Sequence, residues 1–182
     1  MRNTQFLSPS PHTSLTGICR WLCVGLVVSG VSSCAFAQLA VGYEAPITTG
    51  GPGAVVGDVG ATVGLPIGPR AGVLLRGRLG RMFELGAGPE LCVGGPLWPL
   101  WLRADLCGGM PMVIGTYQER LSFGVDPHLR AEAMMLVNST SQGSFYVGPS
   151  AIWGKRVRWT NQPTDEYLGL QIQLTVIMEA LN

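Results

Sequence analysis

Apolar and polar residues alternate along most of this chain, and this alternation constrains the fold more than any other feature of the sequence. In residues 123–132, Asp126, His128, Arg130 and Glu132 stand at every second position, and mostly apolar residues fill the positions between them. Successive side chains of a β-strand point to opposite faces of its sheet, whereas a helix face recurs roughly every three to four residues. The spacing therefore predicts a strand with one charged face and one apolar face.

The same alternation recurs along the chain, with turn-forming residues between the segments. Glycine is abundant, at 26 residues, and it gathers with Pro, Asn and Ser in the intervening stretches. Helical periodicity is almost lacking after residue 38. We therefore predict one all-β domain over residues 38–182, with about eight strands near residues 39–44, 54–65, 70–80, 82–93, 98–109, 120–136, 144–158 and 167–178.

The N-terminal part of the chain, residues 1–37, has the features of an export signal. An apolar run at residues 21–31 follows two arginines, and Ala-Phe-Ala at 35–37 offers the small residues that a signal peptidase accepts. We predict cleavage after this tripeptide, which makes Gln38 the first residue of the mature chain. An alternative stays open, because Val-Ser-Ser-Cys at 31–34 resembles a lipobox that would make Cys34 a lipid-anchored N-terminus.

The cysteines agree with export to an oxidising compartment. Cleavage after residue 37 removes three of the five cysteines and leaves Cys92 and Cys107, both on the polar faces of their segments. Antiparallel pairing of residues 82–93 with 98–109, around a turn within 94–100, brings these two cysteines opposite each other. We therefore predict a disulfide between Cys92 and Cys107 across this hairpin.

Two architectures are compatible with the alternation. A soluble antiparallel barrel turns its apolar face inward, whereas a transmembrane barrel turns it to lipid and lines its lumen with the polar face. The polar face here is rich in glycine, its charges are of both signs, and its cations are arginines, which suits ion pairs in a narrow lumen. We therefore predict a membrane barrel with a lumen charge network made of Arg76, Arg78, Glu84, Glu90, Arg103, Asp105, Asp126, His128, Arg130, Glu132, Arg156 and Arg158.

Aromatic residues favour the same alternative. A membrane barrel carries a girdle of Trp and Tyr at each membrane surface, which means near the ends of its strands. The predicted girdle residues, all towards predicted strand ends, are Tyr43, Trp98, Trp153, Trp159 and Tyr167.

Three predicted strands contain a proline near their middle. Pro89, Pro127 and Pro149 stand in similar seven-residue segments, each on the apolar face. Proline cannot donate a ladder hydrogen bond, and a closed barrel has no free edge where this loss is harmless. We therefore expect a bulge or a local kink at each of these prolines.

The region from residue 38 onward resembles the small eight-stranded outer-membrane β-barrel proteins of Gram-negative bacteria. The resemblance rests on the signal peptide, the alternating segments and the final strand YLGLQIQLTVIM. It implies an antiparallel up-and-down transmembrane β-barrel in the outer membrane, with outer-membrane lipid and the barrel assembly machinery as partners. Such proteins commonly end in Phe or Trp, whereas this chain ends in EALN.

The sequence holds no complete catalytic or cofactor-binding constellation. His128 is the only histidine after residue 38, Ser122 and Ser150 are its nearest serines, and no nucleotide-binding or nucleophile motif is present. One histidine and two disulfide-bonded cysteines do not make a metal site. We therefore predict no cofactor, no metal and no enzymatic activity, and a structural, adhesive or envelope-interaction role.

Two other classes of function stay open. One is a soluble or lipid-anchored periplasmic barrel that binds a small apolar ligand, and the other is an outer-membrane lipid-modifying enzyme that uses His128. An eight-stranded barrel has room only for side chains, so we expect a lumen filled by charged groups rather than an open pore. The net charge of +1 gives no reason to expect nucleic acid as a partner.

Overall fold

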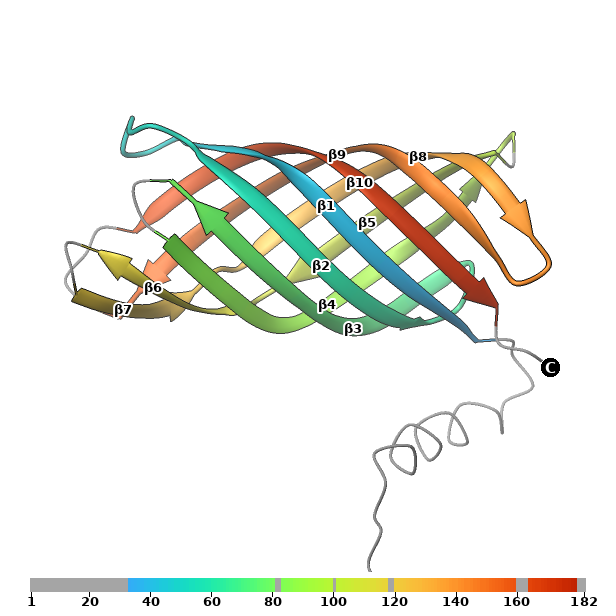
Figure 1. The fold of residues 1–182 in the computed structure, drawn as a ribbon, viewed down its shortest axis with the longest axis horizontal. Coiled ribbons are helices and arrows are strands. Elements are labelled where there is room, and N and C mark those ends of the chain that lie inside the picture. The colour runs from blue at the N-terminus through green and yellow to red at the C-terminus, as the bar shows by residue number, and fades with distance from the viewer. Residues whose placement is uncertain (1–32, 81–82, 100, 118–119, 160–163, 180–182) are drawn as a thin grey trace, which may run out of the picture. The chain divides into compact units, whose positions relative to one another are not determined.

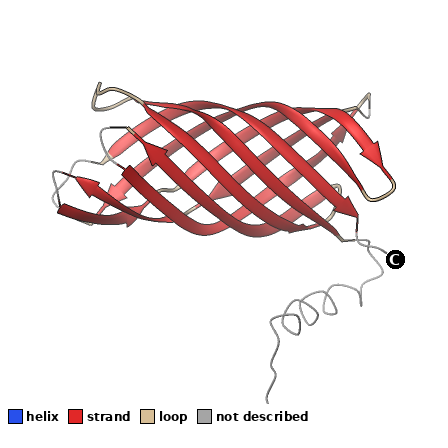
Figure 2. Ribbon diagram, viewed as in Figure 1, coloured by secondary structure: helices blue, strands red, loops and turns tan. Residues whose placement is uncertain are grey.

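Antiparallel β-strands make up all the regular structure of the computed structural model, which describes residues 33–80, 83–99, 101–117, 120–159 and 164–179 (Figure 2). Within these ranges no helix has the length and hydrophobicity of a membrane span. The strands are β1 (Cys34–Pro46), β2 (Ala54–Gly64), β3 (Gly68–Leu79), β4 (Phe83–Leu97), β5 (Leu102–Gly109), β6 (Met112–Tyr117), β7 (Arg120–Val125), β8 (His128–Thr140), β9 (Gly143–Arg158) and β10 (Asp165–Glu179).

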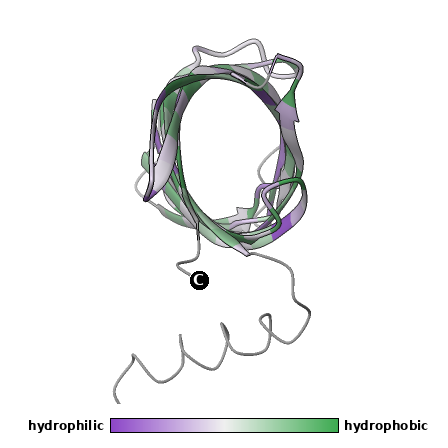
Figure 3. Ribbon diagram, turned by 90° about the vertical axis from the view of Figure 1, so that its right-hand side faces the viewer, coloured by the Kyte–Doolittle hydropathy of each residue, from purple (hydrophilic) through white to green (hydrophobic). Residues whose placement is uncertain are grey.

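The strands close into a barrel, which Figure 1 shows from the side and Figure 3 along its length. Strands β1 to β4 pair in sequence order, β9 pairs with β10, and β10 returns to β1 in continuous register from Cys34↔Glu179 to Pro46↔Tyr167. Closure gives every strand two partners, so the ladder has no open edge. The predicted up-and-down barrel is confirmed.

The ten strands form eight walls, because β5 and β6 cross the barrel as one wall and β7 and β8 as another. Glu90 of β4 pairs with Gly109 of β5, and Ala87 pairs with Met112 of β6, in an unbroken register. The pairing of β5 with β8 continues in the same way into the pairing of β6 with β7. The predicted count of eight spanning segments is therefore confirmed.

The prediction differs from the structure around residues 110–127. It placed no strand between 109 and 120, where the structure has β6, and it treated 120–136 as one strand, where β7 ends at Val125 and β8 begins at His128. Both interruptions contain a proline, Pro111 in one and Pro127 in the other. Proline lacks the N–H that a continuous ladder needs, which explains why each wall is divided at this level.

The prolines interrupt a ladder without forming a bulge. The carbonyl of Pro89 accepts a hydrogen bond from Met110 N at 3.3 Å, and that of Pro127 accepts one from Lys155 N at 3.0 Å. The backbone polar atoms of Pro89 and Pro127 therefore point to one neighbouring wall each. Only the ladder with that wall lacks the N–H donor of the proline. The register shift that the structure does show lies between Leu136 and Asn138, away from the prolines. The expected bulge is therefore not found at Pro89 or Pro127, where the ladder is interrupted locally instead.

Burial alternates along the strands and shows which face is inside. On β10 the outward residues Leu170 and Ile172 are each 70% exposed, whereas the inward residues Gln171 and Gln173 are 3% and 0% exposed. A soluble barrel has the opposite arrangement, with its apolar face inside. The described strands therefore build the inside-out arrangement of a transmembrane β-barrel.

Strand β1 begins at Cys34, before the predicted cleavage point after Ala37. Phe36, 1% exposed, lies inside the barrel with the guanidinium of Arg70 4.2 Å from the centre of its ring. Cys34, Phe36, Met134, Tyr146 and Ile177 form an apolar cluster at the end of the barrel where β1 begins and β10 ends, which we call the terminus end. The opposite end of the barrel, where β1 ends and β10 begins, we call the loop end. Residues 1–32 of the predicted signal peptide lie outside the described residues.

Candidate functional site

The inward faces of the strands place charged side chains from most walls into one lumen. Of the predicted network residues, all are buried except Arg158, whose side chain is still only 8% exposed. The structure adds four charged residues that the predicted network did not contain, Glu44, Asp58, Arg70 and Asp165. These groups form ion pairs at three levels between the loop end and the terminus end.

At the loop end, Arg76 on β3 and Tyr167 on β10 link walls that are not neighbours. Nε and Nη2 of Arg76 donate to the two carboxylate oxygens of Asp58 at 2.8 and 2.9 Å, and its Nη1 donates to the hydroxyl of Tyr167 at 2.8 Å. That hydroxyl donates in turn to Asp126 at 2.8 Å. The chain of charge-assisted bonds runs across the lumen and joins walls that do not pair with each other.

Tyr167 is therefore not the girdle residue that the sequence predicted. It is 0% exposed, and the guanidinium of Arg156 lies 4.1 Å from the centre of its ring. Its position on β10 has the same parity as Gln171, which places it on the inner face. The other predicted girdle residues are outside, and Trp98, at 89%, is the most exposed of them.

A second group at the loop end is organised around two glutamates. Glu84 accepts from Arg78 at 3.0 Å and from Arg158 at 2.6 Å, and Glu44 is hydrogen-bonded to Arg156. Two cavities beside Arg156 hold about 10 Å³ each. A space of that size holds about one water molecule, so side chains fill this part of the lumen.

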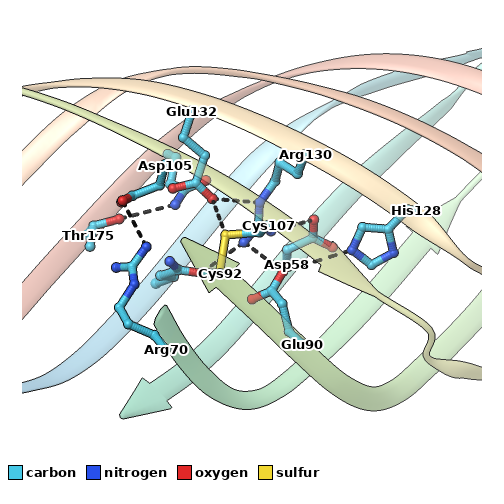
Figure 4. Close-up of a disulfide and its surroundings, with 12 residues drawn as sticks. Asp58, Arg70, Glu90, Cys92, Asp105, Cys107, His128, Arg130, Glu132 and Thr175 are labelled. Atoms are coloured by element: carbon cyan, nitrogen blue, oxygen red, sulfur yellow. Dashed lines mark hydrogen bonds and ion pairs between the residues drawn. A yellow bond between two sulfur atoms is a disulfide. The ribbon is translucent and has the colours of Figure 1, made fainter. Parts of the chain in front are cut away.

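In the middle of the lumen, Arg130 on β8 is the central cation (Figure 4). Its Nε lies 2.7 Å from Glu132, and its Nη2 lies 2.9 Å from Glu90 and 2.8 Å from the side-chain oxygen of Gln38. The guanidinium thus joins β8, β4 and β1. Because it is 1% exposed, its charge depends on these partners rather than on water.

At the terminus end, Asp105 on β5 forms ion pairs with two arginines. Arg103 contacts both carboxylate oxygens, at 2.7 and 3.1 Å, and Nη2 of Arg70 lies 2.9 Å from Oδ1. Both guanidinium groups also lie against the ring of Phe36, at 4.2 and 5.2 Å from its centre. The ring of Phe36 thus stabilises the two guanidinium charges by cation–π contacts.

The predicted disulfide between Cys92 and Cys107 is confirmed (Figure 4). The two residues are directly opposite in the β4–β5 ladder, with Cα atoms 4.0 Å apart. Pairing of this hairpin starts at Leu97↔Leu102, so its turn is longer than a tight two-residue hairpin, as the sequence indicated. Glu90 lies close to both sulfur atoms, but sulfurs that are bonded to each other are not available as metal ligands.

His128 lies on the inner face of β8 without a catalytic partner among the described residues. Its Nδ1 lies 3.1 Å from the backbone oxygen of Asp126, and its Nε2 lies 3.9 Å from Glu90. The hydroxyl of Ser150 donates to Gln171 instead, and the hydrogen bond of the imidazole goes to the backbone of Asp126 and not to Ser122. One ring nitrogen is therefore within hydrogen-bond distance of a backbone oxygen, and the other lies beside a carboxylate of the charge network at more than hydrogen-bond distance.

Comparisons with known proteins gave two results without a match and two structural likenesses. No protein-family model matches the chain, and no curated protein matches its sequence. Designed transmembrane β-barrels have a TM-score of 0.42 and 13% identity over 81% of this chain and 95% of theirs. The crystal structure of Neisserial surface protein A has a TM-score of 0.55 and 9% identity over 81% of this chain and 97% of that one. This last likeness shows that the chain has the fold of the small eight-stranded outer-membrane β-barrels.

Proposed function

We propose that the chain is an outer-membrane β-barrel protein with a structural or adhesive role and a closed lumen. The observation that carries the proposal is the opposition of its two faces. Arg130 inside is 1% exposed, and Ile172 outside is 70% exposed. Water cannot solvate the outer face favourably, whereas the hydrocarbon core of a bilayer can, and the ion pairs inside need no bulk water.

The charged interior argues against a soluble barrel that carries an apolar ligand. Such a barrel needs an apolar cavity inside, whereas the middle of this lumen holds Arg130, Glu90 and Glu132 in direct contact. An apolar ligand there would separate these charges and leave them unpaired. The ion pairs therefore support a lumen that stabilises the barrel instead of one that binds cargo.

The surroundings of His128 give no support to a lipid-modifying enzyme. Nucleophilic catalysis needs a serine within hydrogen-bond reach of the base, and Ser150 is bonded to Gln171. We therefore assign the function to the outer surface and to the ends of the barrel. Outer-membrane lipid and the barrel assembly machinery are the partners that this proposal includes.

The proposal is tested by fractionation and by gel mobility. The full chain, expressed with its export signal in a Gram-negative host, should sediment with outer membranes. It should also migrate differently on an unboiled gel than after boiling, because a folded barrel resists detergent. Recovery in the soluble periplasmic fraction would refute the membrane assignment.

The closed lumen is tested separately by electrical recording. Purified protein in a planar bilayer should give no steady single-channel conductance, because arginine and carboxylate side chains fill the lumen. A porin reconstituted in parallel serves as the positive control. Reproducible stepwise currents from this protein alone would contradict the closed lumen but would leave the membrane assignment intact.

A further inference from the structure

The outward face carries a groove where the proline interruptions lie. The groove has a volume of about 520 Å³, and Leu91, Gly108, Met110, Leu129 and Trp153 contribute to its apolar lining. This volume falls within the range of about 300–1,000 Å³ that ligand sites occupy. The groove lies on the outer face of the barrel, which we assign to lipid, so we expect a molecule of the bilayer to fill it.

Two rows of residues that cross four walls explain why the surface is hollow here. In the first row, Gly108 stands between Leu91 of β4 and Leu129 of β8, and Leu129 is opposite Trp153 of β9. A glycine between large side chains leaves an opening at its position. A Cβ atom at Gly108 would lie 3.8 Å from the backbone oxygen of His128, an ordinary contact, and 3.3 Å from Cδ2 of Leu129, so only the end of this side chain would have to shift.

The second row lies towards the loop end and contains two short, rigid side chains. Met110 stands beside Pro89, and Lys155 stands beside Pro127, joined in each case by a backbone hydrogen bond. Proline offers little side-chain volume, so this row leaves the groove open on its loop-end side. The hollow thus follows directly from the residues that also interrupt the ladders.

Lys155 places a positive charge at the margin of this apolar groove. It is the only lysine in the chain and is three residues from the end of β9 at Arg158. Its side chain is 49% exposed, and its Nζ lies 3.2 Å from Glu166. An ammonium group has three donors, so the contact with one carboxylate leaves donors for a second acceptor.

We propose that the groove binds one acyl chain of an anionic, phosphate-bearing membrane lipid, for which phosphatidylglycerol is the probe, and that a phosphate oxygen of this lipid accepts a hydrogen bond from Lys155. The inference rests on the proposed membrane location and adds a specific lipid site to it. Lysine near the end of a membrane segment extends its ammonium to the polar interface, which is the depth at which lipid phosphates lie. The acyl chain then runs from that depth along the apolar groove beside Trp153.

Trp153 provides a fluorescent reporter inside the groove. In the full chain, Trp21, Trp98, Trp101 and Trp159 are replaced by Phe, which leaves Trp153 as the only tryptophan. The protein is reconstituted in phosphatidylcholine vesicles that contain a small fraction of phosphatidylglycerol with brominated acyl chains, which quench nearby tryptophan. A parallel sample carries the same fraction of brominated phosphatidylcholine.

A matched control places the reporter on a wall distant in the strand order. The Val59→Trp substitution is made in a chain whose own tryptophans are all replaced by Phe, because Val59 points outward from β2 and is 53% exposed. We expect brominated phosphatidylglycerol to occupy positions next to Trp153 with about a two- to fivefold preference over phosphatidylcholine, the range that a partly exposed ion pair supplies. At the control position we expect no preference.

Two variants separate the charge from the groove. Lys155→Gln should abolish the preference for phosphatidylglycerol and leave general quenching unchanged. Gly108→Val fills the opening and should reduce quenching of Trp153 by both lipids, and an unboiled gel checks that this variant folds. If Gly108→Val does not fold, Leu129→Phe serves as the second filling variant.

The outcomes distinguish this inference from the proposed function. Equal quenching by both lipids at both reporters would overturn the lipid site and leave the membrane barrel intact. Weaker quenching at Trp153 than at the control would also overturn it, because protein such as a second copy of this chain would then cover the groove. No quenching at either reporter would refute the membrane location itself.

Discussion

Arg130 on β8 and Glu90 on β4 are ion-paired over the inner face of β5, with Nη2 2.9 Å from Oε1. The side chains of both residues are at most 1% exposed, and Arg130 also contacts Glu132. Replacing Arg130 by Met leaves two buried carboxylates without their common cation. We expect this change to lower the free energy of unfolding by about 3–5 kcal/mol, measured by urea titration of the refolded barrel.

The exposed pair between Lys155 and Glu166 is the matched control for this experiment. Its two side chains are 49% and 33% exposed, so solvent screens the interaction. We expect Glu166→Gln to change the free energy of unfolding by less than about 1 kcal/mol. Equal, small effects of both substitutions would mean that the lumen is hydrated and that its ion pairs are not needed for stability.

The two faces of β10 predict opposite accessibility to lipid at adjacent residues. Ile172, in the middle of the strand, is 70% exposed, and Gln173 beside it is 0% exposed. A fluorophore attached to Ile172→Cys should be quenched strongly by a quencher at the bilayer centre, and Gln173→Cys should resist labelling. The background carries Cys34→Ser and keeps the disulfide. Labelling of both positions to the same extent would contradict the assignment of faces.

A charge introduced at Ile172, on the outer face of β10, should destabilise the barrel. We expect Ile172→Arg to lower the free energy of unfolding in lipid vesicles by about 2–4 kcal/mol, because Ile172 is at the middle of its strand. Leu102→Arg, at the start of β5 near the terminus end, should cost less, because the penalty decreases towards the interface. Equal costs at the two positions would contradict a bilayer centred on the barrel.

The disulfide should protect both cysteines and stabilise the fold. Mass spectrometry of exported protein alkylated without reductant should show no adduct on Cys92 or Cys107. The double substitution to Ala should lower the free energy of unfolding by about 3 kcal/mol, since the sequence separation is 15 residues. Two alkylated thiols in the exported protein would contradict the bridge.

The start of β1 leads us to expect a mature chain that retains Phe36. Residues 34–37 pair with β2 on one side and with β10 on the other, and Phe36 contacts the guanidinium of Arg70. Cleavage after Ala37 would remove these residues from two ladders and open the apolar cluster. Intact mass measurement of the exported protein distinguishes an N-terminus before Phe36 from one at Gln38. A mass that corresponds to Gln38 at the N-terminus would contradict our expectation.

Local patterns in the sequence were sufficient for the walls and the disulfide. Alternation predicted the strand around Arg130, and the positions of Cys92 and Cys107 about one turn predicted their pairing without knowledge of the rest of the barrel. The segment MVIGTY of β6 was missed because it contains no charged residue to mark its inner face. Tyr167 was assigned to the girdle because its position near a strand end outweighed its parity.

Contacts across the lumen could not be predicted from the sequence. The bond from Arg76 to Tyr167 joins residues 91 positions apart, and it exists only because β10 closes on β1. The groove likewise depends on the register of four walls, which brings Gly108 between Leu91 and Leu129. Sequence alone indicated most of the charged residues that face inward, whereas closure of the barrel determined which of them meet.

The position of the disulfide determines the order of two folding events, oxidation of the cysteines and closure of the barrel. Cys107 is 0% exposed and Cys92 is 3% exposed, with their sulfur atoms inside the closed wall. An enzyme or a small-molecule oxidant cannot reach them there, because thiol–disulfide exchange needs direct attack on sulfur. Oxidation therefore comes first, while the hairpin of β4 and β5 is still open to its surroundings, and enclosure comes second. The folded barrel therefore contains a disulfide that formed before the barrel closed.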